Sequence, residues 1–189
     1  MLRQLPNLLS IGRGLCAVPL IWLITTGQWP QAFWLGLLAG LTDLLDGWLA
    51  KRYGWQSRLG AALDGLADKT LLLGAFIALV WAGHLPGWWL ILVLSRDLLI
   101  VLGTFAYNTL IDKIKPQPSV LGKAATFAQI VLALAVIAGH ANATQLIQWQ
   151  PELLWAAALL TLASGVHYAV VWSLRAWRVV QGRRGQQSE

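Results

Sequence analysis

Four aspartates at fixed spacings are the residues best suited to chemistry in this 189-residue chain. Asp43 and Asp46 stand three residues apart, and Asp64 and Asp68 stand four residues apart. Either spacing places both carboxylates of a pair on one face of a helix. The chain has only eight acidic residues, so these four are half of its carboxylates. The stretch between Asp43 and Asp68 is therefore its most concentrated chemical feature.

A cluster of carboxylates in apolar surroundings needs a counter-charge. Each aspartate costs ~2.5–3.5 kcal/mol at the centre of a membrane helix, and like charges repel unless they are protonated or bind a cation. A divalent metal is the simplest solution, and oxygen ligands without nearby histidine or cysteine favour Mg²⁺, Mn²⁺ or Ca²⁺ over zinc. The alternative is ion pairing with a basic side chain, for which Arg13, Lys69 and Arg96 are the candidates.

The helices that carry the aspartates also carry small residues. Gly47 and Ala50 follow the first pair, and Gly60 and Ala61 precede the second. Small side chains leave space on a helix face, so a bulky ligand can approach the backbone beside the carboxylates.

The composition predicts an all-α integral membrane protein of one domain over residues 1–189. Hydrophobic residues make up 57% of the chain and charged residues 12%, against about 25% charged in average soluble domains. A very apolar soluble helical domain is the alternative. Six segments have about the length that a helix needs to cross the bilayer, and the first is expected to continue as a membrane helix rather than act as a cleaved signal peptide. The predicted spans are roughly residues 8–26, 30–50, 60–82, 86–109, 119–139 and 152–176.

The basic residues predict the orientation of these six transmembrane helices. One set of connections and the two ends hold lysines and arginines, and the other set (27–30, 83–87 and 140–151) holds none. This asymmetry places both termini and the 51–59 connection in the cytoplasm. The net charge of +6 is then explained by the anionic cytoplasmic leaflet, and no nucleic-acid partner is required.

Tryptophans are expected to mark the outer membrane interface, where aromatic belts form. Those near the outer ends of the predicted spans are Trp29, Trp81, Trp88, Trp89, Trp149 and Trp155.

The pattern Asp-x₂-Asp-Gly-x₂-Ala-Lys-x₈-Gly-x₃-Asp-x₃-Asp, from Asp43 to Asp68, resembles the signature of the CDP-alcohol phosphatidyltransferases. That signature has arginine where this chain has Lys51, and every other fixed position matches. The segment Leu5-Pro-Asn-Leu-Leu-Ser10 is similar to the family's amino-terminal motif. Six spans with both ends inside also suit the family, so the resemblance covers essentially the whole chain.

The resemblance implies a metal-dependent transfer of a phosphatidyl group from CDP-diacylglycerol to an alcohol, with release of CMP, in phospholipid biosynthesis. Asp43, Asp46 and Asp64 are implied ligands of two divalent ions, Mg²⁺ or Mn²⁺, and Asp68 is the implied general base that also touches metal. Two such ions would neutralise the diphosphate and stabilise in-line displacement. Residues expected to contact the CDP donor are Gly47, Ala50, Lys51 and Gly60. Lysine at position 51 keeps the charge but loses the planar fork of arginine.

Basic residues outside the motif are candidates for binding a phosphate-bearing acceptor. They are Arg58 before Gly60, Arg96 within the fourth predicted span, and Lys123 at the start of the fifth. The alternatives are a plain loop charge for Arg58, an ion pair with Asp97 or Asp68 for Arg96, and membrane anchoring for Lys123. Arg13 could either snorkel to the interface or contact the donor phosphate.

Two branches of the family differ in their acceptor. Ser95-Arg96-Asp97 and the segment from Lys115 to Lys123 resemble the cardiolipin synthases, which use phosphatidylglycerol. Phosphatidylglycerophosphate synthases, which use glycerol-3-phosphate, are the alternative. The family also implies a homodimer, and the charge map places the active site at the cytoplasmic face, expected to be that of a bacterial inner membrane. Rival classes are a small transporter, which would not need this spacing, and a non-enzymatic scaffold, which would be expected to lose an aspartate.

Overall fold

The computed structural model describes the backbone over residues 5–52, 58–110 and 119–186. Side chains are described over the same ranges except 5–9, 44–52, 58–59, 61–63, 106–108, 110 and 175–186.

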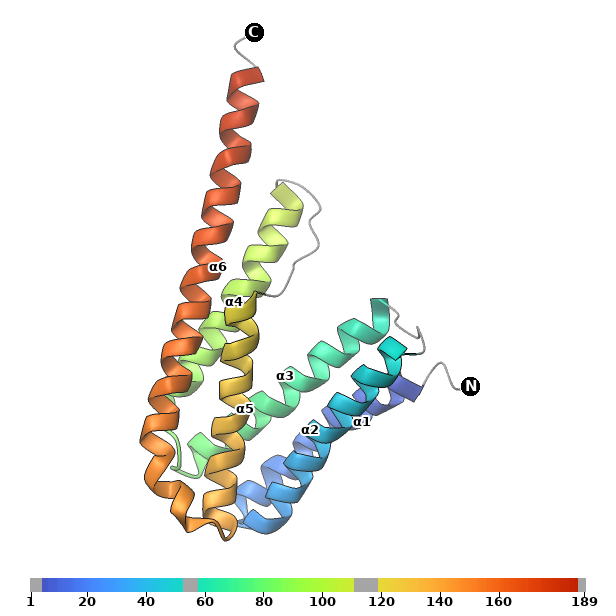
Figure 1. Ribbon diagram of the computed structural model, residues 1–189, viewed down its shortest axis with the longest axis vertical. Helices are drawn as coiled ribbons and strands as arrows, with labels where there is room; N and C mark the ends of the chain where they lie inside the picture. Colours follow the sequence, from blue (N-terminus) through green and yellow to red (C-terminus); the bar gives the residue numbers. More distant parts are fainter. Residues whose placement is uncertain (1–4, 53–57, 111–118, 187–189) are drawn as a thin grey trace. The chain divides into compact units, whose positions relative to one another are not determined.

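Over these ranges the chain is helical and contains no strand, which confirms the all-α prediction (Figure 1). The elements are α1 (Leu5–Thr25), α2 (Trp29–Arg52), α3 (Arg58–Trp81), α4 (Gly87–Leu110), α5 (Val120–Ala141), the 3₁₀ helix η2 (Thr144–Trp149) and α6 (Gln150–Gln186). The α-helix starts lie within three residues of the predicted spans. The end of α6 lies well beyond residue 176, because no proline interrupts the polar sequence that follows the apolar part.

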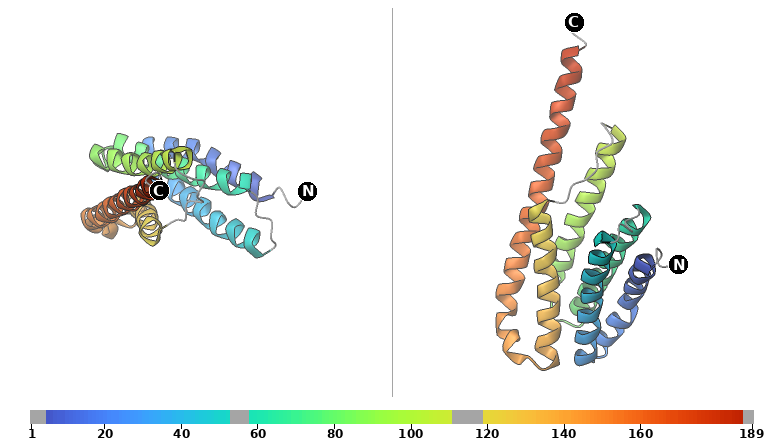
Figure 2. Two further views of the ribbon diagram at one scale, coloured as in Figure 1. Left: turned by 90° about the horizontal axis from the view of Figure 1, so that it is seen from above. Right: turned by 45° about the vertical axis from the view of Figure 1, so that its right-hand side comes forward.

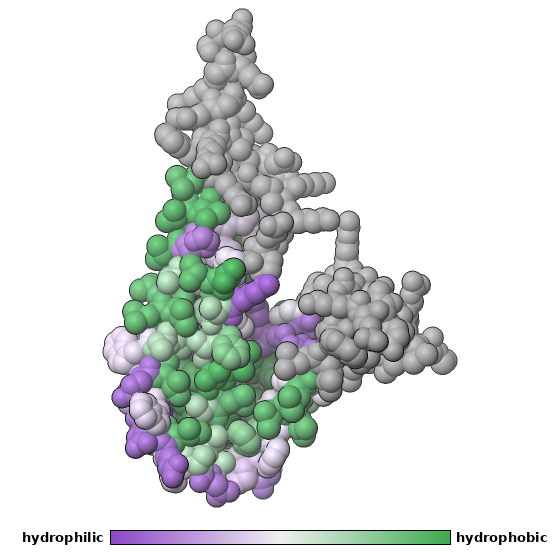
Figure 3. Space-filling view, in the orientation of Figure 1, coloured by the Kyte–Doolittle hydropathy of each residue, from purple (hydrophilic) through white to green (hydrophobic). Residues whose placement is uncertain are grey.

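Three stretches of the described residues are long and apolar enough to cross a membrane. They are Gly87–Phe105, Val120–Ala141 and Thr144–Leu174. Large apolar side chains stand exposed along them, among them Ile91, Phe105 and Leu159, each more than 60% exposed. Figure 3 shows this hydrophobic cover along the visible flank of α6. Exposed apolar surface on this scale fits contact with lipid, so the chain is an integral membrane protein.

The chain forms two compact units. The first is Met1–Gly87 with Ile130–Pro151, and the second is Trp88–Gln129 with Glu152–Glu189. In the first unit α1 packs chiefly against α3 and secondarily against α2, and the three helices lie side by side in both views (Figures 1 and 2). Its core contains Leu20, Ile24, Phe76 and Leu79, all at most 2% exposed.

Glycines with positive φ end two of these helices. Gly27 (φ 73°) follows α1, and Gly83 (φ 78°) follows α3. In each cap the glycine N–H donates to the carbonyl three residues back, and the next N–H donates to the carbonyl five residues back, at 2.8–3.1 Å. This is the Schellman arrangement, which satisfies helix carbonyls that would otherwise lack a donor. Both helices therefore end at sharply defined points.

In the second unit α6 contacts α5 through a buried polar pair and contacts α4 through two stacked tryptophans. Gln129, at the α5 end of this unit, donates from Nε2 to Thr161 Oγ1 at 3.0 Å, and both residues are buried. Trp88 and Trp155 stack with ring centroids 5.6 Å apart. Trp89 is fully buried, so the prediction that it belongs to an interfacial belt is wrong. Successive helix positions differ by about 100°, so Trp88 and Trp89 cannot face the same surroundings.

Candidate active site

Three of the four predicted carboxylates converge in the first unit. Asp43 lies in the second half of α2, and Asp64 and Asp68 lie in the first half of α3. One carboxylate oxygen from each lies within 4.8 Å of the others. The i, i+4 spacing places Asp64 and Asp68 on one face of α3. The packing of α1 against both α3 and α2 brings Asp43 close to them. The sequence predicted that the carboxylates of the two helices converge.

The convergence carries a large electrostatic cost. Two unit charges 4.8 Å apart repel by about 1 kcal/mol in water and by about 3.5 kcal/mol at the effective dielectric constant of a protein surface. All three side chains are 32–44% exposed, so water screens part of this repulsion. A positive charge at the centre is still the simplest way to hold them together.

Arg13 of α1 supplies that charge. Its Nη1 pairs with Oδ1 of Asp43 and with Oδ1 of Asp68, and it lies 3.3 Å from Oδ1 of Asp64. The Arg13 side chain is 2% exposed. The ion-pair alternative for the aspartates is thus present for Arg13, which contacts all three carboxylates from a single nitrogen.

Ser10 lies one turn before Arg13 on the same face of α1. Its hydroxyl donates to Asp64 Oδ1 at 3.2 Å, and the residue is 3% exposed. The spacing of three residues places both side chains toward α3. The amino-terminal half of α1 is therefore part of the carboxylate site.

The cluster fits a hard divalent cation. Asp43, Asp64 and Asp68 offer only carboxylate oxygens, which Mg²⁺ and Mn²⁺ prefer. The guanidinium nitrogen of Arg13 shows where these oxygens favour positive charge. The three carboxylates exceed the one arginine charge, so the described part of the site can take up further cations.

Several predicted site residues have side chains outside the described ranges. They are Asp46, Gly47, Ala50 and Lys51 in α2 and Arg58 in α3. Gly60 is described, half-buried in the first turn of α3. Their roles as metal, donor and acceptor contacts remain predictions.

Arg96 lies in the middle of α4 in the second unit and is 8% exposed. Its Nη1 pairs with Asp97 Oδ1 at 2.7 Å, which is one of the alternatives that the sequence left open. Its Nη2 donates to Ser164 Oγ at 3.2 Å and to the Gly122 carbonyl at 3.3 Å. Three helices of this unit therefore fix the guanidinium.

The Nε donor of Arg96 is buried and has no hydrogen-bond partner among the described residues. The side chain also lines a groove of about 200 Å³ between α4 and α6, whose other walls are Leu92, Ser95, Leu99, Thr161, Leu162, Gly165, Val166 and Ala169. A buried guanidinium with an open donor beside a groove is suited to binding an anion.

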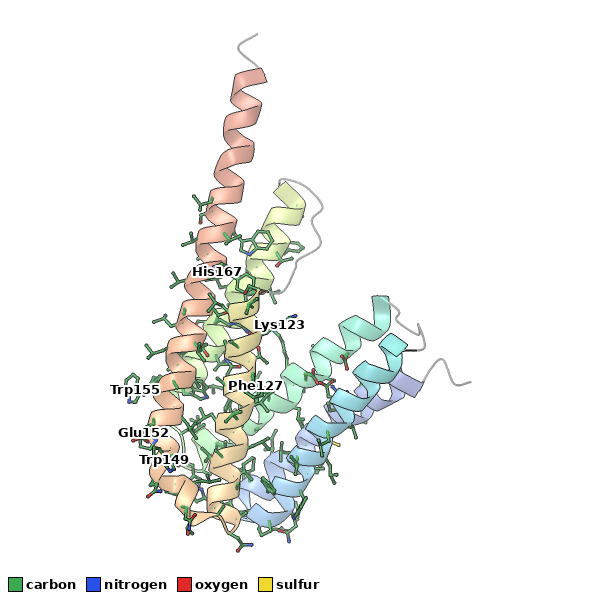
Figure 4. The ribbon with its side chains drawn as sticks, viewed as in Figure 1. Lys123, Phe127, Trp149, Glu152, Trp155 and His167 are labelled. Carbon is green, nitrogen blue, oxygen red and sulfur yellow. The ribbon has the colours of Figure 1, made fainter. Side chains whose placement is uncertain are left out.

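Lys123 lies in the first turn of α5 and is exposed (Figure 4). Its backbone N–H donates to the Ser119 carbonyl at 3.1 Å, which holds this turn. Tyr168 of α6 accepts the Ser119 N–H at 3.1 Å, so α6 also supports the beginning of α5. An exposed ammonium in this position remains compatible with acceptor binding and with membrane anchoring.

Sequence reasoning missed Ser10 and Ser164 as partners of the site. The signal for Ser10 was available, since it precedes Arg13 by one turn. Ser164 carried no signal, because it lies 68 residues from Arg96 and is one of several small polar residues in an apolar helix.

The sequence matches the family described as CDP-alcohol phosphatidyltransferase over residues 3–178. It is 34% identical to a human cardiolipin synthase (CMP-forming) over 92% of this chain and 57% of that protein. It is 30% identical to the rat cardiolipin synthase (CMP-forming) over 95% of this chain and 64% of that protein. A CDP-diacylglycerol–glycerol-3-phosphate 3-phosphatidyltransferase of Rickettsia bellii is 33% identical over 87% of this chain and 93% of that protein. The chain spans about six tenths of the length of the two cardiolipin synthases.

Proposed function

Because the chain belongs to the CDP-alcohol phosphatidyltransferase family, we propose that it transfers a phosphatidyl group from CDP-diacylglycerol to the hydroxyl of a glycerol-type alcohol. The observation that supports this most directly is the convergence of Asp43, Asp64 and Asp68. In the family signature these are the residues implied to hold metal and to accept the proton.

The reaction exchanges one phosphorus–oxygen bond for another. The acceptor hydroxyl oxygen attacks the phosphorus that carries diacylglycerol, the bond to the bridging oxygen breaks, and CMP leaves with that oxygen. Asp68 takes the hydroxyl proton as general base. Asp43, Asp46, Asp64 and Asp68 would hold two divalent ions, Mg²⁺ or Mn²⁺, which neutralise diphosphate charge. Gly47, Ala50, Lys51 and Gly60 would accommodate the cytidine nucleotide.

The acceptor that we propose is phosphatidylglycerol, which would give cardiolipin. The motif Ser95-Arg96-Asp97 supports this choice, and so does the sequence similarity to two cardiolipin synthases. Arg58, Arg96 and Lys123 would bind the acceptor phosphate, and the open Nε of Arg96 is the observation that favours Arg96 most. The second candidate acceptor is glycerol-3-phosphate, favoured by the match to nearly the whole of the Rickettsia enzyme.

The setting that we propose is a bacterial inner membrane. One domain with six spans would place both termini and the carboxylate site at the cytoplasmic face, in keeping with the distribution of lysine and arginine. The active form would be a homodimer, as the family resemblance implies.

The test is CMP release from CDP-diacylglycerol by purified protein with Mn²⁺ or Mg²⁺, over a panel of acceptors. We expect release with phosphatidylglycerol, none with EDTA, and a loss of about 10² to 10⁴ in rate for Asp68→Asn. Glu152→Gln is the matched control, because Glu152 is an exposed carboxylate in the first turn of α6 (Figure 4). Full activity of Asp68→Asn would contradict the site. Activity with glycerol-3-phosphate and none with phosphatidylglycerol would show that glycerol-3-phosphate is the acceptor.

A further inference from the structure

Arg13 occupies the centre of the carboxylate site. One of its nitrogens contacts Oδ1 of Asp43, Asp64 and Asp68. The same three carboxylates each offer one oxygen to a possible metal ion. A nitrogen in contact with all three carboxylates and a metal ion bound by all three would need the same space. The guanidinium and the ion therefore compete for one position.

From this arrangement we propose that Arg13 is a tethered cation that holds the metal-free site together and exchanges places with the metal. The inference rests on the proposed function only in that the aspartates bind metal. Arg13 keeps the three carboxylates converged when no ion is present, and its guanidinium leaves their centre when an ion enters. The cost of that departure lowers the affinity for the ion.

The surroundings of Arg13 support a built-in role rather than a chance contact. The side chain is 2% exposed, whereas the three carboxylates are 32–44% exposed. The cation thus enters from the protein side and leaves the carboxylates open to solvent. Ser10, one turn earlier, separately anchors Asp64, so Asp64 retains a hydrogen bond after Arg13 moves.

Two consequences distinguish exchange from a purely structural arginine. A structural arginine stabilises the protein equally with and without metal. An exchanging arginine stabilises only the metal-free protein, and its removal strengthens metal binding. Both consequences are measurable without turnover.

The experiment measures Mn²⁺ affinity by titration calorimetry and Tm with EDTA or saturating Mn²⁺, in detergent. For Arg13→Gln we expect about tenfold tighter Mn²⁺ binding, a clear fall of Tm in EDTA, and a Tm near wild type in Mn²⁺. Arg13→Lys keeps the charge without the planar fork, so its Mn²⁺ affinity and its Tm in EDTA should lie between those of wild type and Arg13→Gln. Arg13→Gln is purified in saturating Mn²⁺, which should keep it folded, and Mn²⁺ is removed with EDTA and dialysis immediately before the titration.

The matched control is Lys69→Gln. Lys69 is exposed beside Asp68, so this variant removes the same unit of charge from the edge of the site. We expect at most a threefold change in Mn²⁺ affinity. Three results would each overturn the exchange. The first is an equal gain in Mn²⁺ affinity for Lys69→Gln and Arg13→Gln, and the second is unchanged or weaker Mn²⁺ binding by Arg13→Gln. The third is an equal fall of the Arg13→Gln Tm in EDTA and in Mn²⁺.

Asp64→Asn separates this inference from the proposed function. If Asp64→Asn fails to weaken Mn²⁺ binding, the metal site itself is wrong and the exchange falls with it. If Asp64→Asn weakens binding and Arg13→Gln does not strengthen it, only the exchange is wrong.

Discussion

Arg96 illustrates how much a single buried charge is constrained. Its guanidinium contacts Asp97, Ser164 and the Gly122 carbonyl, and its Nε has no partner among the described residues. A buried donor without a partner costs about 1–3 kcal/mol. An acceptor phosphate would remove that cost when it binds.

Replacement of Arg96 should therefore act on the acceptor and not on the donor. For Arg96→Gln we expect the acceptor KM to rise at least tenfold, with the KM for CDP-diacylglycerol unchanged. Ser164→Ala removes one hydrogen bond, worth about 1 kcal/mol, and should raise the acceptor KM by about fivefold. The measurement is steady-state CMP release with each substrate varied in turn.

The control for Arg96 is Thr104→Ala. The Thr104 hydroxyl donates to the Ile100 carbonyl of the same helix α4 at 2.7 Å, and Thr104 does not line the groove beside Arg96, so its loss should leave both KM values unchanged. A rise in the donor KM for Arg96→Gln would show that Arg96 serves the other substrate.

At the residue scale the sequence predicted that Asp64 and Asp68 lie together and converge with Asp43, because spacing decides which residues share a helix face. That these carboxylates ligate metal stays a prediction. The sequence left the pairing of Arg13 open, because that depends on which face of α1 meets α3. Packing of three helices settles this question, and no local pattern in residues 8–26 encodes it.

Among the elements, α1 and α3 depend on close approach. A Cβ placed on Gly74 of α3 would lie 3.2 Å from Ile21 Cδ1 and 3.5 Å from Ala17 Cβ of α1. The absence of a side chain at this position therefore lets the two helices pack closely.

A large side chain at Gly74 should separate α1 from α3. We expect Gly74→Leu to lower Tm by several degrees, because overpacking costs about 1–3 kcal/mol. Gly40→Leu in α2 is the control, since nothing lies within 4 Å of a Cβ at that position. The Tm is measured in detergent by thermal unfolding. Equal Tm values for the two variants would show that close packing at Gly74 does not contribute to stability.

The opposite end of the first unit holds a cluster of aromatic rings. The rings of His84 and His140 have centroids 4.0 Å apart, and Trp29 lies within 5.0 Å of both. Gln150 Nε2 donates to the His84 carbonyl at 2.5 Å, and His140 Nδ1 lies 2.9 Å from the Val136 carbonyl oxygen. Burial, with a smaller effect from His140, lowers the pKa of His84.

This shift predicts that stability falls in acid. Since the pKa of His84 is lower in the folded protein, the unfolded chain binds more protons as the pH falls below about 6.5. The stabilisation is complete above that pH and is lost as the pH falls toward the folded pKa. We expect the fall of Tm between pH 7.5 and 5.5 to be smaller for His84→Asn than for wild type.

The matched control for His84 is His167→Asn, because His167 is an exposed histidine of α6 (Figure 4). Its Tm should depend on pH as wild type does. A His84→Asn protein with the wild-type pH dependence would assign the acid sensitivity to other groups.

At the scale of the elements, apolar runs and Pro–Gly breaks predicted six α-helices, and the structure confirms them. The 3₁₀ helix η2 was not predicted, because its sequence Thr-Gln-Leu-Ile-Gln-Trp has no periodic pattern. The extent of α6 was also missed, since a hydropathy argument ends a span where charge begins while helical hydrogen bonding can continue.

The whole molecule is predicted to cross the membrane six times with its ends inside. In a Cys16→Ser background, Asn142→Cys should react with a membrane-impermeant maleimide added to intact spheroplasts. Ser188→Cys should react only after permeabilisation. Asn142 is exposed and directly follows α5, so a lack of labelling would mean the opposite orientation or an odd number of spans.

The glycine caps also relate the reaction to the thickness of the membrane. Arg13 precedes Gly27 by 14 residues and Asp68 precedes Gly83 by 15, which corresponds to about 21–23 Å along a helix axis. In the proposed orientation, with the capped ends at the outer surface, the carboxylates would lie within the depth of a hydrocarbon layer of about 30 Å. Shorter acyl chains would thin this layer and bring the carboxylates nearer to the water on the proposed cytoplasmic side. The access of the proposed product, CMP, to the carboxylate site would then depend on the length of the lipids in which the protein resides.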